Sequence, residues 1–142
     1  MVSKIVLLFA VASLASCATR HCSPGSEFEP SLCALSLPQI NDIDIRKNAS
    51  RSAQADDATQ CDDFVLTEAQ LRMFFSATKQ IDASDAHHTL DWSPCNASGD
   101  VRFSDGRVGQ WTISQSRLGS LAIDGDEEIT LYCPRCRFTP FK

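Results

Sequence analysis

Hydrophobic side chains recur at helical spacing in residues 68–81, so this segment is predicted to form an amphipathic helix. Thr67 and Gln70 just before and within it fit the S/T-x-x-E/Q capping box, in which each side chain bonds the backbone of the other residue. The predicted buried stripe consists of Leu71, Phe74, Phe75, Thr78 and Ile81.

Beyond residue 90 the period changes from helical spacing to alternation, which is typical of half-buried strands. Asp105-Gly106 and Gly125 lie between alternating runs and are typical hairpin turns. The predicted strands cover residues 95–103, 108–115, 119–123 and 128–133.

These elements predict an α+β domain over residues 61–142, in which one N-terminal helix packs on a four-stranded antiparallel meander. A domain of this size buries a modest core, so we expect it to be disulfide-stabilised. The strand residues expected to face the helix are Val101, Phe103, Trp111, Ile113, Leu121, Ile129 and Leu131.

Residues 17–60 have a different composition, rich in Ser, Ala, Asp, Asn and Pro, with few aliphatic side chains to bury. Only residues 32–45, LCALSLPQINDIDI, are more apolar, which suits a short strand or a segment that docks onto the domain. We therefore expect residues 17–60 to be a flexible tether.

The first 16 residues have the features of a secretory signal. Lys4 precedes an apolar stretch from Ile5 to Ala15, which as a helix rises only about 16 Å, roughly half of a bilayer core. The following LASC, residues 14–17, resembles the lipobox of bacterial lipoproteins. The resemblance implies cleavage before Cys17, acylation of Cys17, and anchoring to the outer membrane on its periplasmic face.

The chain carries 13 basic and 18 acidic side chains, and Lys4 is the only charged residue in the predicted signal. The mature chain would therefore be acidic, which argues against a nucleic-acid partner because no basic patch is interleaved with aromatic residues. An acidic surface would suit a basic protein partner instead.

Six cysteines follow Cys17, an even number that indicates a disulfide framework in an exported protein. They are Cys22, Cys33, Cys61, Cys95, Cys133 and Cys136. We expect a bond between Cys22 and Cys33, with Cys133 and Cys136 bound to Cys95 and Cys61. A direct bond between Cys133 and Cys136 is the competing arrangement.

The C-x-x-C motif at Cys133 and Cys136 also raises two chemical alternatives. A thioredoxin-like redox site needs a helix after the motif, but only RFTPFK follows, with Pro140 inside it. A tetrahedral zinc site needs two further ligands, and no second cysteine pair or H-x₃₋₅-H spacing supplies them. A structural staple is the preferred interpretation, with thiol-disulfide exchange as the third-ranked function.

Other polar clusters give no stronger signal for chemistry. His87 and His88 lie in a polar connection, and residues 124–128, DGDEE, lack the order of a calcium loop and fit an acidic turn. We expect Trp92 and Trp111 to be core or sheet-face residues. No catalytic motif, metal site or cofactor site is predicted.

Residues 90–136, from LDWSPC through DGRVGQW to LYCPRC, resemble a group of small proteobacterial envelope proteins, and this resemblance implies a domain but no activity. The combined features predict a non-enzymatic, membrane-anchored lipoprotein that binds a periplasmic protein. Its most specific form is an inhibitor or immunity protein against an envelope-targeting toxin or hydrolase. The alternative is a cell-envelope assembly or structural lipoprotein.

Overall fold

The computed structural model describes residues 21–142, so the predicted signal peptide and the predicted lipidation site, Cys17, lie outside the described residues. Within that range no helix has the length and apolar character needed to span a membrane. The elements are β1 (Cys22–Ser23), β2 (Leu32–Cys33), β3 (Ile40–Arg51), α1 (Glu68–Ala77), β4 (Lys79–Ile81), α2 (Ala83–Thr89), β5 (Cys95–Phe103), β6 (Val108–Ser114), β7 (Leu118–Ile123) and β8 (Ile129–Tyr132).

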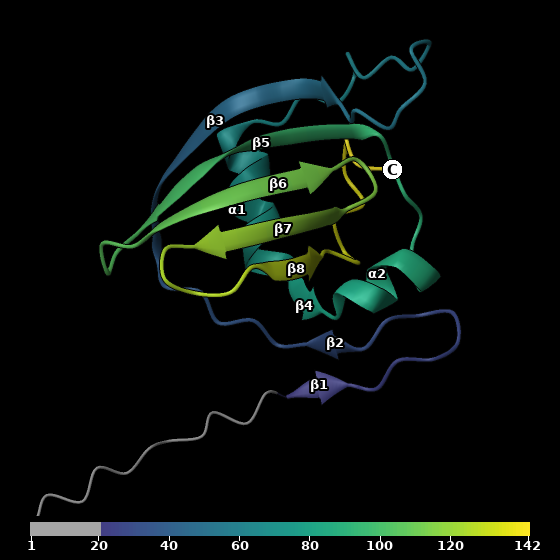
Figure 1. Ribbon diagram of the computed structural model, residues 1–142. Helices are drawn as coiled ribbons and strands as arrows, with labels where there is room; N and C mark the ends of the chain where they lie inside the picture. The colour runs from purple at the N-terminus through teal and green to yellow at the C-terminus, as the bar shows by residue number, and fades with distance from the viewer. Residues whose placement is uncertain (1–20) are drawn as a thin grey trace, which may run out of the picture.

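The strands form one eight-stranded antiparallel sheet in the order β1-β2-β4-β8-β7-β6-β5-β3, and α1 packs against one face of it (Figure 1). The expected α+β fold with a four-stranded meander is therefore wrong. The four predicted strands are present, but the sheet continues beyond them on both sides, and in the described part of the chain only two short helices accompany it.

Three of the additional strands come from residues 17–60, the expected tether. β3 pairs with β5 along its whole length, with register shifts that accommodate its irregular spacing of apolar residues. Its inward side chains, Ile43 and partly Ile45, reach the core, while Asp42 and Asp44 are exposed. A strand at the edge of a sheet, with one face exposed to solvent, needs few apolar residues. The polar composition of β3 therefore resembled that of a linker.

The fourth additional strand, β4, replaces the last turn of the predicted helix. The capping box at Thr67 and Gln70 is present as predicted, but α1 ends at Ala77 and Thr78 is extended, with φ −68° and ψ 155°. Lys79 to Ile81 then pair with β8. Ile81 is buried, but as the cross-strand partner of Thr130 it lies outside the core cluster that contains the buried residues of α1. The apolar pattern alone did not reveal the end of α1, because a buried strand residue happens to continue the helical spacing.

The core lies between α1 and the inward face of the sheet. Leu71, Phe74 and Phe75 of α1 are buried there, and Trp111 is 1% exposed, with its indole N–H donated to the carbonyl of Asp100 at 3.0 Å. The inward strand residues named above are buried as predicted, with Ile129 partly so. Because one face of the sheet is filled in this way, its opposite face is left for other contacts.

Candidate binding surface

Within residues 21–142, three disulfides cross-link the fold, joining Cys22 to Cys33, Cys61 to Cys95, and Cys133 to Cys136. The bond between Cys22 and Cys33 matches the prediction, but the expected bonds from the C-x-x-C motif to Cys95 and Cys61 are wrong. The competing arrangement, a bond within the motif, is the one present.

The C-x-x-C disulfide is almost fully enclosed, since Cys133 and Cys136 are 0% and 1% exposed. A thiolate must reach a disulfide sulfur to exchange with it, so this burial argues against thiol-disulfide exchange. The motif follows β8 and closes a tight turn in which the Cys136 N–H is donated to the carbonyl of Cys133 at 3.2 Å. Within residues 21–142, no group of His, Cys, Asp and Glu has an arrangement that could hold a metal ion.

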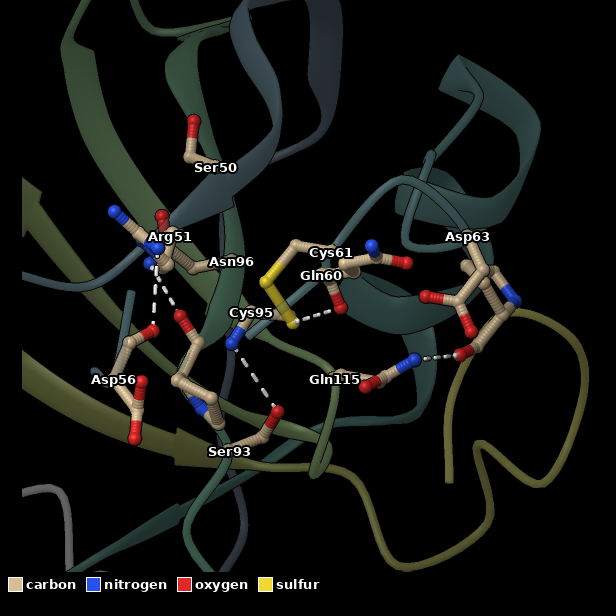
Figure 2. Close-up of a disulfide and its surroundings, with 12 residues drawn as sticks. Ser50, Arg51, Asp56, Gln60, Cys61, Asp63, Ser93, Cys95, Asn96 and Gln115 are labelled. Atoms are coloured by element: carbon tan, nitrogen blue, oxygen red, sulfur yellow. Dashed lines mark hydrogen bonds between the residues drawn. A yellow bond between two sulfur atoms is a disulfide. The ribbon is translucent and has the colours of Figure 1, made fainter. Parts of the chain in front are cut away.

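The disulfide between Cys61 and Cys95 closes the base of a loop that projects from the end of β3, residues 52–60, here called the Arg51 loop (Figures 1 and 2). Beside the disulfide, the Ser52 N–H is donated to the carbonyl of Pro94 at 2.8 Å, which ties the start of the loop to the residue before β5. Both ends of the loop are therefore held against the same strand.

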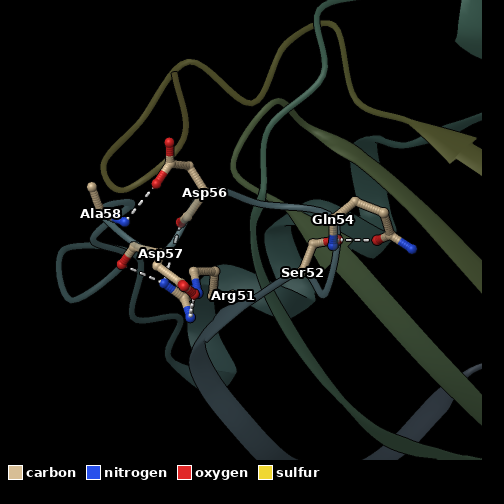
Figure 3. Close-up of polar contacts among 6 residues, drawn as sticks. All are labelled: Arg51, Ser52, Gln54, Asp56, Asp57 and Ala58. Atoms are coloured by element: carbon tan, nitrogen blue, oxygen red, sulfur yellow. Dashed lines mark hydrogen bonds and ion pairs between the residues drawn. The ribbon is translucent and has the colours of Figure 1, made fainter.

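Arg51 also holds the loop from within (Figure 3). Its guanidinium donates to the backbone carbonyls of Asp56 and Asp57 at 3.2 and 2.6 Å, and to the Asp57 carboxylate at 3.1 Å. The Asp56 carboxylate in turn accepts the N–H of Ala58 at 2.9 Å. These bonds connect the loop to the end of β3 and to itself, although the Asp57 side chain is fully exposed.

The outward face of the sheet carries short polar side chains in a regular row. Ser98, Thr112, Ser120 and Thr130 are successive cross-strand partners on β5, β6, β7 and β8. Partners on antiparallel strands share a face, so their hydroxyls form a continuous band on the side opposite α1. Such a band offers hydrogen bonds without long, flexible charged side chains.

Three members of this band, all but Ser98, line a hollow of about 380 Å³, here called the Trp92 groove. It is lined by Ala83, Ala86, His87, Trp92, Ser93, Thr112, Ser114, Leu118, Gly119, Ser120 and Thr130. Trp92 is 63% exposed, so it is not a core residue but lies beside the outward face of the sheet, whereas Trp111 is a core residue as predicted. The polar connection around His87 forms the short helix α2, which flanks the groove.

Asp82 begins α2 as its N-cap. The Ser84 hydroxyl and backbone N–H are donated to the Asp82 carboxylate at 2.6 and 2.8 Å, and these bonds lower the pKa of Asp82. The N-cap remains ionised at neutral pH and keeps α2 in place beside Trp92.

The Arg51 loop and the Trp92 groove are neighbours, because Pro94, which accepts the Ser52 N–H, is two residues from Trp92. Sequence reasoning missed both features. The signals it could have used are an arginine five residues before an Asp-Asp pair and a tryptophan followed by Ser-Pro, a composition that favours a turn over a strand. Comparison of this chain with family models, curated proteins and solved structures gave no match.

Proposed function

We propose that this protein is an exported, lipid-anchored inhibitor that binds another protein of the cell envelope through the Arg51 loop. The observation that carries the proposal is that this loop projects from the sheet while its base and its interior are both fixed, by the Cys61–Cys95 disulfide and by Arg51. A segment that is already rigid loses little conformational entropy on binding, so it can enter a cleft tightly.

The charge of the loop indicates the kind of partner. Asp56 and Asp57 lie next to each other, and Arg51 is the one cation among residues 21–142 that is bonded to them. The chain as a whole is acidic, with a formal net charge of −5. A hydrolase with a basic active-site cleft would meet complementary charge, which accelerates association and orients the two proteins.

The neighbouring Trp92 groove supplies apolar contact area for the same partner. Exposed tryptophans are over-represented among residues that dominate binding energy, because a rigid indole buries a large area at little entropic cost. In this arrangement the loop provides specificity and Trp92 provides much of the affinity.

The test is capture of the partner from envelope extract by the tagged full chain, followed by assay of the captured hydrolase with purified protein. We expect stoichiometric inhibition by the wild type and at least tenfold weaker inhibition by Asp57→Arg. Glu127→Arg is the matched control, because it makes the same charge change at another exposed site, the β7–β8 turn. Equal loss of inhibition in the two variants would refute a role for the loop and leave only net charge.

A second variant, Trp92→Ala, tests the groove. Met73→Ala is its control, since Met73 is also an exposed apolar residue but lies on α1. If the partner dissociates from both variants alike, or from neither, the groove does not belong to the interface. Recovery of an assembly complex whose activity the protein leaves unchanged would favour the alternative role in envelope assembly.

A further inference from the structure

Another cavity, also of about 380 Å³, lies between the β1–β2 segment and the residues that follow β8, and Arg117 in its lining is adjacent in the chain to Leu118 of the Trp92 groove. We name it the Arg117 pocket. The residues that carry the argument are Phe28, Glu29, Arg117, Tyr132, Pro134 and Arg137.

Two of the three disulfides shape this pocket. Phe28 and Glu29 lie inside the loop closed by Cys22 and Cys33, and Pro134 lies inside the loop closed by Cys133 and Cys136. The β1–β2 segment, which forms one wall of the pocket, is further held by the Ser31 hydroxyl, which donates to the carbonyl of Ser23 at 2.9 Å. Opposite walls that are each cross-linked give a preformed cavity, as ligand sites commonly have.

Arg117 is held at the pocket in an unfavourable backbone conformation. It ends the turn between β6 and β7, where its N–H is donated to the carbonyl of Ser114 at 3.1 Å, and its φ is +67°. Glycine or asparagine is usual at such a position, because a side chain with φ in this range is strained. Strain at a residue that lines a cavity points to a functional role for its side chain.

The Arg117 guanidinium is positioned but not neutralised. One Nη donates to the carbonyl of Pro134 at 3.2 Å, and the group lies over the Tyr132 ring, 5.6 Å from its centroid. Its Nε is buried without a hydrogen-bond partner among residues 21–142. In the same part of the chain, neither Arg117 nor Arg137 forms an ion pair with a carboxylate.

Glu29, on the β1–β2 segment, likewise has no ion-pair partner in the part of the chain that the structure describes. The pocket thus presents two guanidinium groups and one carboxylate, with the exposed ring of Phe28 and the half-buried ring of Tyr132 between proline side chains. A ligand that complements this set carries a carboxylate, an ammonium group and an apolar side chain.

We propose that the Arg117 pocket binds a small zwitterion, either a free amino acid or a dipeptide with an apolar side chain. Its carboxylate binds Arg117 and Arg137, its ammonium group binds Glu29, and its side chain packs on Phe28 and Tyr132. This site is separate from the Arg51 loop and does not depend on inhibition of a hydrolase.

The experiment is calorimetric titration of the oxidised full chain, in nonionic detergent, with Gly-Phe, Gly-Phe amide, N-acetyl-Gly-Phe and free phenylalanine. Amidation of the dipeptide removes the carboxylate charge and should weaken binding at least tenfold, and acetylation should weaken it severalfold. Tighter binding of Gly-Phe than of phenylalanine identifies a peptide site, and the reverse order identifies an amino-acid site.

Arg117→Gly should weaken Gly-Phe binding at least tenfold without lowering the melting temperature, because glycine relieves the strained turn while removing the guanidinium. If that variant fails to fold, Arg137→Gln makes the same test at an exposed side chain, and Arg102→Gln on β5 is the control for lost positive charge. The proposal is overturned if neither Gly-Phe nor phenylalanine binds, if the amide binds as well as the acid, or if Arg117→Gly and Arg137→Gln bind like the wild type.

Discussion

The disulfide between Cys61 and Cys95 should be the largest single covalent contribution to stability. It closes a loop with a sequence separation of 34, whereas the bond between Cys133 and Cys136 spans a separation of 3. In the chain-entropy model, restricting the unfolded chain in these two ways is worth about 4 and about 2 kcal/mol, respectively.

The comparison is well matched, because all four cysteines are buried to at least 96%. Replacing either pair by alanine therefore removes similar packing, and the difference of about 2 kcal/mol between the two double variants reports the loop length. For a chain of this size, loss of the Cys61–Cys95 bond should lower the urea midpoint by about 2–3 M.

The assay is urea unfolding followed by tryptophan fluorescence in a Trp92→Phe background. Trp111 is then the only fluorophore of its kind, and it is 1% exposed in the core, so it reports the global transition. The reasoning is refuted if Cys133→Ala/Cys136→Ala lowers the free energy of unfolding as much as Cys61→Ala/Cys95→Ala, or more. The dependence of the free energy of unfolding on urea should also be steeper in the variant without the Cys61–Cys95 bond than in the wild type, since its unfolded chain exposes more surface.

Three further outcomes are expected. Phe141→Ala should cost about 3–4 kcal/mol in urea unfolding, because it empties the core position where this ring contacts three other phenylalanines. A cost near zero would show that the C-terminal segment is not part of the cooperative unit. Gly99→Ala should lower the melting temperature by several degrees or prevent folding, because the added Cβ would overlap the backbone carbonyl of Asp44 in β3. An unchanged melting temperature would mean that β3 can move away at little cost. The pKa of the Asp105 carboxyl is lowered from 3.8 in the folded state, because the Arg107 backbone N–H donates to it. Ionised Asp105 therefore adds a small amount to stability above pH 3.8, and this contribution is lost as the pH falls through the folded pKa. A carboxyl NMR titration that gives a pKa at or above 3.8 would contradict this.

The parts of the fold that were predicted correctly are those with a strong local signal. The capping box at Thr67 and Gln70 and the glycine turns, with φ of +90° at Gly106 and +84° at Gly125, specify their structure through residues adjacent in the chain. The alternation in residues 95–133 is strong because one face of each strand is largely buried and the other is mostly polar and partly exposed.

The parts that were missed depend on partners distant in sequence. β3 is a strand because β5 pairs with it, and β4 is a strand because β8 offers an edge, and neither fact is visible in residues 40–51 or 79–81 alone. The Arg117 pocket combines two segments about 90 residues apart, closed by separate disulfides, so only the folded chain brings its charges together.

The last residues of the chain are built into the centre of the molecule. The Phe141 ring stacks on Phe74 with centroids 5.7 Å apart, and the Lys142 N–H is donated to the carbonyl of Gln115 at 2.9 Å. A chain that emerges N-terminus first, from a ribosome or through a translocation channel, therefore cannot complete this core until Phe141 has emerged, long after α1 and most of the sheet. Until then the gap among the aromatic rings stays open, so the core closes late in synthesis or export.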